Sequence, residues 1–208
     1  MNLYKHLAVI TKSKSATNRP ILQHFHYNKE SQSVSVCDSH RMLEFKSKET
    51  IEKTINIHYQ TMQVADENLP YPNLQRLKPS KADIVAKIDV RSINPSLLQL
   101  LKVYKKEVIK LSINEKSLTI ETDQQIITTL PLLETTETCY LYMNCTYFID
   151  LLTFFIDYNK EVRCESLIAG FCGINRPIFF ETENRQFFYL ITPIRKKRIK
   201  SKRTIISC

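Results

Sequence analysis

One carboxylate and one histidine lie close enough in the sequence to suggest acid–base chemistry. Asp38 and His40 are separated by a single residue, and a carboxylate that orients an imidazole is a common arrangement for proton transfer. The sequence around the pair does not show the combination of a nucleophile and a second carboxylate that hydrolysis or group transfer would require. We therefore interpret His40 as part of a structural turn, and we expect the protein not to be an enzyme.

The cysteines do not form a recognisable metal site. No two of them are spaced as CxxC, and a zinc site needs paired ligands at short spacing. Residues 1–12 lack the long apolar stretch and cleavage site of a signal peptide. We therefore expect reduced thiols in a cytoplasmic protein, with no metal and no cofactor. The six cysteines are Cys37, Cys139, Cys145, Cys164, Cys172 and Cys208.

Glycine is scarce, which excludes two large enzyme classes. Only Gly170 and Gly173 occur in 208 residues. A glycine-rich phosphate loop of the GxxxxGK[ST] or GxGxxG type is therefore impossible. This argues against a P-loop NTPase and against a Rossmann dinucleotide enzyme. No run of 18 apolar residues is present either, so we expect no membrane span.

Positive charge is concentrated at the C-terminus. The net charge is +9, and the segment 195–203 contributes seven positive charges and no acid. The rest of the chain is therefore close to neutral. A weaker basic cluster lies near the N-terminus, before the first acidic residue, Glu30. Such a tail is either a solvated end or a nucleic-acid contact, and a basic protein favours an anionic partner.

The first part of the chain predicts a helix followed by short strands. Apolar positions at 3–11 favour a helix, and the polar segment 13–20 reads as a connection that ends in proline. Alternating segments at 21–27, 33–37, 41–45 and 53–59 predict strands. The segment 68–79 contains three prolines, so we interpret it as a linker and place a domain boundary near Ser80.

The second part predicts one motif repeated twice. Strands are expected at 84–90, 108–113, 117–122, 125–130, 139–143, 161–167, 177–181 and 187–192, with helices at 95–105 and 146–158. Each half therefore reads strand, helix and then three strands. Repeats of this kind imply an α+β fold of antiparallel sheets with helices on one face. The leucines of the first helix, and Phe148, Leu151, Leu152 and Phe155 of the second, form buried stripes.

Three stretches share short motifs with one family. CDSHRML at 37–43 is similar to a [ST]DxHRL loop that follows a strand pair. YPNLQRLKP at 71–79 is similar to the connector FPDYRRVLP. The segment 84–195 contains LYMNCTYFIDLL and ends with YLITPIR, which is similar to YVVMPMR. Taken together and in this order, they resemble the bacterial DNA polymerase III beta subunit, the sliding clamp.

The resemblance implies a ring-forming protein that surrounds duplex DNA and binds short peptides of polymerases and other replication proteins. Apolar side chains would form the peptide groove, and Arg41, Arg76 and Arg195 would pair with the peptide. The implied groove residues are Asp38, Ser39, His40, Arg41, Met42, Pro72, Arg76, Leu77, Leu190, Ile191, Thr192, Pro193, Ile194 and Arg195. The expected DNA-binding residues are Lys5, Lys12, Lys14, Arg19, Lys102, Lys105, Lys196, Lys197, Arg198, Lys200, Lys202 and Arg203.

The chain also departs from the family pattern. Residues 1–79 resemble a shortened middle domain, residues 80–195 resemble the complete last domain, and residues 196–208 form a basic tail that the family lacks. About one and a half clamp domains are therefore expected, in a homo-oligomer whose closure into a ring the sequence leaves open. Asp150 and Asp157 make the second helix a poor surface for a phosphate backbone.

Three functions remain open at this point. The first is a sliding-clamp-like processivity factor of DNA replication. The second is a non-ring clamp mimic that sequesters replication proteins through the same groove. The third is an unrelated basic nucleic-acid-binding protein.

Overall fold

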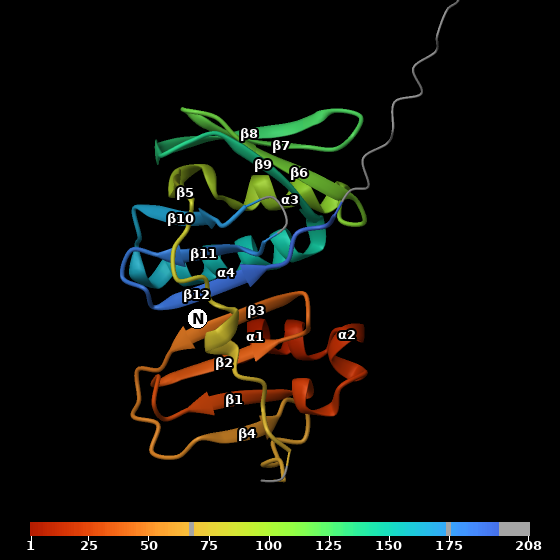
Figure 1. Ribbon diagram of the computed structural model, residues 1–208, viewed down its shortest axis with the longest axis vertical. Helices are drawn as coiled ribbons and strands as arrows, with labels where there is room; N and C mark the ends of the chain where they lie inside the picture. The colour runs from red at the N-terminus through yellow and green to blue at the C-terminus, as the bar shows by residue number, and fades with distance from the viewer. Residues whose placement is uncertain (67–68, 174–175, 196–208) are drawn as a thin grey trace, which may run out of the picture.

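The strands of the chain join into one continuous antiparallel sheet that runs the length of the molecule (Figure 1). The structure is a computed structural model that describes residues 1–66, 69–173 and 176–195. Within these residues the sheet has 12 strands in the order β4-β1-β2-β3-β12-β11-β10-β5-β8-β7-β6-β9. This confirms the expected α+β class with antiparallel sheets and a few helices.

The first part of the chain, residues 1–79, contributes four strands to one end of the sheet and begins with the helices α1 and α2. Two expectations were wrong here. The segment expected as a plain connection contains a short helix, because Ser13 caps it by accepting a hydrogen bond from the Ala16 amide. The strand expected from Ile21 begins later, after a 3-10 turn at Pro20–Gln23. The elements are α1 (Leu3–Thr11), α2 (Lys14–Thr17), β1 (His24–Asn28), β2 (Ser33–Cys37), β3 (Arg41–Lys46) and β4 (Ile55–His58).

The second part shows the predicted strand–helix–three-strand motif twice. Two boundaries were wrong. Helix α4 extends to Val162 and ends at Arg163, whose φ of 55° closes the helix, so the next strand starts at Ser166 rather than Glu161. The strand expected at 125–130 continues to Thr135, because its second half pairs with β5. The elements are β5 (Ile84–Asp89), α3 (Pro95–Val103), β6 (Val108–Ile113), β7 (Ser117–Glu121), β8 (Ile126–Thr135), β9 (Cys139–Asn144), α4 (Cys145–Val162), β10 (Ser166–Phe171), β11 (Ile178–Thr182) and β12 (Phe187–Ile191).

Asparagine caps and apolar stripes explain both helices of the second part. Asn94 accepts a hydrogen bond from the Leu97 amide, with Pro95 in the tolerated first turn, and Asn144 accepts one from the Thr146 amide. The predicted α4 stripe is buried in the core. Helices α3 and α4 pack on each other and lie behind the sheet in Figure 1.

The first part repeats half of the second part. Its strands run in the order β4-β1-β2-β3, and the second part contains the same arrangement as β9-β6-β7-β8. A helix precedes each set, α1 in one case and α3 in the other. The first part therefore corresponds to one half of the larger unit.

The two parts are joined by direct pairing of β3 with β12. The register places Met42 opposite Leu190 and Arg41 opposite Ile191. The backbone ladder therefore continues across the sequence position near Ser80 where we placed a domain boundary. The connector between the parts, residues 71–79, passes in front of the sheet in Figure 1, on the side opposite the helices.

Helix α4 also contacts the first part through its acidic residues. Asp157 lies 3.2 Å from Nε2 of His6, and the His6 ring packs edge-on against Phe154. The amino terminus of Met1 pairs with Glu161. The acidic residue Asp157, which made α4 a poor surface for DNA, therefore faces α1 instead.

The free energy of unfolding should fall as the pH drops below about 6.5. Burial is the largest effect on His6 and lowers its pKa below the ordinary value of 6.5, although Asp157 opposes this change. Burial also lowers the pKa of His24 at the start of β1. The unfolded chain therefore takes up these protons at a higher pH than the folded chain does.

Urea unfolding between about pH 7.5 and about pH 5.5 would measure this dependence. We expect a steady loss of stability toward the lower pH, and a smaller loss in His6→Gln. A stability that is constant or rises as the pH falls would contradict the prediction.

Candidate peptide-binding site

A tight turn between β2 and β3 forms the centre of the candidate site. The Asp38 amide donates to the carbonyl of Arg41 over 3.1 Å, which closes a two-residue hairpin turn. Its first central residue, Ser39, has φ 76°, a left-handed conformation that normally favours glycine. The Asp38 carboxylate holds this turn by accepting hydrogen bonds from the His40 and Arg41 amides, each over 3.1 Å.

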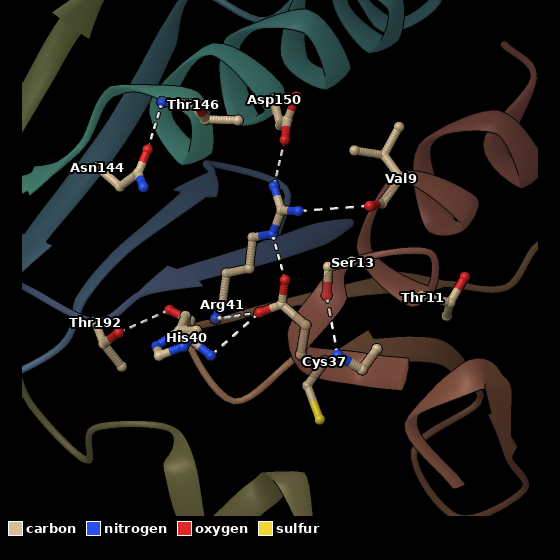
Figure 2. Close-up of polar contacts among 12 residues, drawn as sticks. Val9, Thr11, Ser13, Cys37, His40, Arg41, Asn144, Thr146, Asp150 and Thr192 are labelled. Atoms are coloured by element: carbon tan, nitrogen blue, oxygen red, sulfur yellow. Dashed lines mark hydrogen bonds and ion pairs between the residues drawn. The ribbon is translucent and has the colours of Figure 1, made fainter. Parts of the chain in front are cut away.

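The side chain of Arg41 is buried and bonded to both parts of the chain (Figure 2). Its Nε donates to Asp38 over 2.9 Å, and Nη1 donates to Asp150 of α4. Nη2 donates to the carbonyl of Val9 in α1 over 3.4 Å. The guanidinium carbon lies 4.5 Å from the centre of the Tyr147 ring. These contacts occupy the guanidinium, so we assign Arg41 to the junction in place of the direct peptide contact that the sequence suggested.

The C-terminal segment of the described chain is bonded to the same turn. The carbonyl of His40 accepts hydrogen bonds from the Thr192 amide over 2.8 Å and from its hydroxyl over 2.9 Å (Figure 2). The His40 ring is exposed and stacks loosely on Tyr147, with ring centres 6.1 Å apart. Beyond it, the Ile194 amide donates to the carbonyl of Tyr142 in β9 over 2.7 Å. His40 therefore serves as a structural turn residue, as its sequence context indicated.

The connector is fixed to the outer face of β3 by polar contacts. Its 3-10 turn (η2, Leu74–Leu77) starts at Asn73, which accepts a hydrogen bond from the Gln75 amide. The buried carboxylate of Glu44 accepts bonds from Gln75 over 3.1 Å and from Lys78 over 2.6 Å. One turn earlier, the Tyr71 hydroxyl accepts a bond from the Cys37 amide over 3.2 Å. The connector is therefore held at both ends.

Aromatic packing supports the end of the connector at Lys78. The Lys78 ammonium lies 5.0 Å from the centre of the Phe188 ring, which stacks on Phe179. The Phe179 ring covers Gly170 so closely that a Cβ there would lie 2.1 Å from its Cζ. One of the two glycines of the chain is therefore required by this packing.

The three predicted groove walls come together around one apolar cluster. Met42 of the turn wall, Leu74 of the connector and Leu190 of the C-terminal wall pack on one another in a buried cluster. Met42, Leu190 and Ile191 are buried, and Thr192, Pro193 and Ile194 are half-buried. The remaining predicted residues form an exposed rim, apart from the buried Asp38 and Arg41: Ser39, His40, Pro72, Arg76, Leu77 and Arg195. Met42 and Leu190, together with Leu74, thus form a buried floor, whereas Ile191 belongs to the main core cluster that includes residues of α1 and α4.

The described members of the predicted DNA-binding set are all exposed. Lys5 and Lys14 lie in α1 and α2, and Lys102 lies in α3. Lys12, Lys105 and Arg19 lie next to these helical segments. Residues 196–203 of the predicted set lie outside the described residues. The described set therefore belongs to helices and their ends.

Three residues of the site were not expected there from the sequence motifs. Tyr147 is flanked by Arg41 and His40, Asp150 neutralises Arg41, and Leu74 covers the floor. Tyr147 and Asp150 lie within the motif NCTYFIDLL that carried the resemblance. Leu74 lies within the connector motif. The motifs therefore contained these residues, but their contacts depend on the folded chain.

The described part of the chain was expected to lack a metal site, and its side chains bear on metal binding and on thiol reactivity in two ways. No cluster of three or more His, Cys, Asp or Glu side chains there could hold a metal ion. Burial raises the pKa of Cys139 and of Cys145 to about 11, so both thiols are protonated near neutral pH. Among the described helices none is long and apolar enough to cross a membrane.

Replacing Arg41 with alanine should destabilise the protein by about 3–5 kcal/mol, because Asp38 would remain buried without its partner. The solvent-accessible pair Lys87–Glu134 is a matched control, since Lys87→Ala should cost far less stability than Arg41→Ala. Urea unfolding of both variants measures the difference. An Arg41→Ala variant as stable as Lys87→Ala would show that the buried ion pairs do not hold the junction.

Comparison with solved structures identifies close matches to this fold. The beta chain of DNA polymerase III from Streptococcus pneumoniae matches with a TM-score of 0.71 and 17% identity over 93% of this chain. The Bacillus subtilis sliding clamp matches with 0.71 and 18% over 94%, and the C. crescentus beta sliding clamp with 0.72 and 11% over 93%. The chain spans 63% of the length of each of these clamps.

Sequence comparison alone does not find these proteins. No protein-family model matches the chain, and no curated protein sequence matches it significantly. The similarity is therefore carried by the arrangement of strands and helices rather than by residue identity. The chain has the fold of the bacterial DNA polymerase III beta subunit, the sliding clamp.

Proposed function

We propose that the protein is a clamp-like DNA replication factor that captures short peptides of polymerases and other replication proteins. The observation that carries the proposal is the meeting of three distant segments, 38–42, 72–77 and 190–195, around the cluster of Met42, Leu74 and Leu190. These are the segments that the resemblance assigns to the peptide groove. The similarity of the whole fold to sliding clamps supports the same proposal.

The exposed rim determines what the site can bind. Leu77 is a half-exposed apolar side chain, and Arg76 and Arg195 are exposed cations. An extended peptide with an apolar end and a carboxylate or free carbonyls would match this combination. The buried floor supports the rim, and Arg41 acts through the turn that carries His40. We assign the direct contacts to the rim and to Ile194.

Duplex DNA is the second proposed partner. The exposed lysines and arginine of α1, α2, α3 and their ends provide positive charge on helical segments, and the basic segment 196–203 adds six further charges. Neutralising phosphates in this way gives affinity without sequence preference. This mode of binding requires no catalytic group.

One observation favours a non-ring variant of the same function. The three segments of the candidate site come from one chain, so the peptide site does not itself require a ring. A protein of this kind would hold replication proteins by their peptides without encircling DNA. The two forms share the peptide site, and they differ in the behaviour of the outer strand edges.

A peptide of the QLxLF type should bind with micromolar affinity, roughly −7 to −8 kcal/mol. Ile194→Ala should weaken this binding by about 1–3 kcal/mol, because it removes half-buried apolar surface from the wall. Titration calorimetry gives both values. Leu133→Ala, which removes an exposed apolar side chain from β8, is the control and should leave the affinity unchanged. Equal affinity in Ile194→Ala and in the unaltered protein would contradict the groove.

Affinity for duplex DNA should depend steeply on salt through the basic tail. A chain shortened after Arg195 loses six positive charges. The slope of log affinity against log salt should therefore become shallower by up to about 5, at about 0.9 per phosphate contact. Fluorescence anisotropy over a salt series measures this slope. An unchanged slope would show that the tail is only a solvated end.

A further inference from the structure

An apolar cavity lies between two strand pairs of the second part. Its volume is about 600 Å³. On one side Ile84 of β5 is paired with Phe171 of β10, and on the other side Ile113 of β6 is paired with Cys139 of β9. Leu141 of β9 completes the apolar lining. None of these residues belongs to the predicted peptide groove.

Negative charge borders this cavity. The exposed residues Asp83 and Glu137 line it together with the apolar side chains. Among the described residues that line the cavity there is no lysine or arginine. An apolar side chain that is flanked by cations therefore complements the cavity in both shape and charge.

The described chain ends beside the cavity and runs toward it. Thr192 is bonded to the turn between β2 and β3, which stacks on the first turn of α4, just after the end of β9. Two residues later, the Ile194 amide donates to the carbonyl of Tyr142 within β9. The chain thus passes along β9 from its end toward its start. Cys139, in the lining of the cavity, is three residues further in that direction, or about 10 Å.

The outer edge of β9 can accept more of this segment. In the described part of the chain β9 pairs with β6 alone, so its other edge is the end of the sheet. The Tyr142 carbonyl that accepts the Ile194 amide faces this outer edge. Every second residue of an antiparallel strand directs its backbone groups to the same side, so Tyr140 faces the outer edge as well. The bond at Ile194 therefore starts a register that the following residues can continue.

The sequence after Arg195 has the side chains that the cavity requires. Residues 196–208 lie outside the described residues, and the sequence at 196–200 is KKRIK. Ile199 is the first apolar residue after Ile194 and follows it by five positions. An extended chain of five residues spans up to about 17 Å, which is enough to reach Cys139. Ile199 is flanked on both sides by cations, and two acids border the cavity.

We propose that residues 196–200 bind to this chain's own β9 edge, with Ile199 in the cavity and the neighbouring cations beside Asp83 and Glu137. This assigns the start of the tail a third role, besides the solvated end and the nucleic-acid contact that the sequence left open. Docking on β9 and contact with an anionic partner are then alternative states of the same cations. Neither peptide binding nor DNA binding is needed for the docked state.

The rate at which Cys139 reacts with iodoacetamide in the full chain measures whether the cavity is covered. Cys145 is the internal reference, because it is fully buried and the pKa of both thiols is raised to about 11. Ile199→Asp should speed the reaction of Cys139 about tenfold, as expected for a tail that is docked about nine tenths of the time. It should leave Cys145 unchanged, which shows that the fold is intact. Mass spectrometry of the modified peptides gives both rates.

Ile205→Asp is the matched control, since it makes the same change further along the tail and should alter neither rate. Raising the salt concentration from about 50 mM to about 1 M should speed the reaction of Cys139 in the unaltered protein, because salt screens the ion pairs. Amide hydrogen exchange of Tyr140 is a second readout that does not depend on thiol reactivity. It should be slower in the unaltered protein than in Ile199→Asp.

Three outcomes would overturn the proposal. The first is that neither Cys139 reactivity nor Tyr140 exchange differs between Ile199→Asp and the unaltered protein. The second is an equal effect of Ile205→Asp, because the apolar end of the tail would then occupy the cavity. The third is protection of Cys139 that increases with protein concentration, because the tail of a second copy would then be bound. Ile199→Asp should not change the affinity for the QLxLF peptide, so failure of the groove and failure of this contact can be told apart.

Discussion

The buried guanidinium of Arg41 is the constraint on which the junction depends. A cation removed from water must be neutralised and hydrogen-bonded where it lies. Its partners come from the turn before β3, from α4 and from α1, so the charge is satisfied only when all three are in place. Arg41 thus couples the correct pairing of β3 with β12 to the correct docking of the helices. The same contacts position His40 and, through its carbonyl, the segment that starts at Thr192.

The two faces of the sheet at this junction are covered by different segments of the chain. On the helix side, α1 and α4 are held by Asp150, Asp157 and aromatic packing around Phe154. On the opposite side the connector lies across the sheet and is fixed by Glu44. Because these contacts are tertiary, the candidate peptide site depends on the junction as a whole. The exposed rim residues can therefore be substituted without loss of the fold, because they make none of these contacts.

The repeated half-unit occurs in two different environments within this chain. In the first copy, α1 and β3 are covered by α4 and β12, which gives a continuous sheet across the two parts. In the second copy, Leu100 and Val103 of α3 and Ile126 of β8 are exposed in the part of the chain that the structure describes. Met42, which lies opposite Leu190 and packs in one cluster with Leu74, is therefore buried, whereas Ile126 is 63% exposed.

The sequence by itself determined the elements, their order and the repeated motif of the second part. These features are set by interactions between residues close together in the sequence. Examples are the alternation at 33–37 and 108–113 and the helix caps at Asn94 and Asn144. Short motifs also indicated the sliding-clamp fold and the segments of the candidate site. The helix of α2 and the full length of α4 were missed, because a short cap and the left-handed residue Arg163 decide where these helices begin or end.

Only the tertiary structure decided the roles of the charged residues. The sequence predicted that Arg41 would contact a peptide and that Asp150 and Asp157 would make α4 a poor surface for DNA. A sequence shows charged residues without showing their partners. Folding places Asp150 against Arg41 and Asp157 against His6, so these charges hold the two parts together. Likewise, the pairing of β3 with β12 joins residues 142 to 150 positions apart, from Phe45 with Phe187 to Arg41 with Ile191. Pairing over such a separation depends on packing and register, which no local pattern contains.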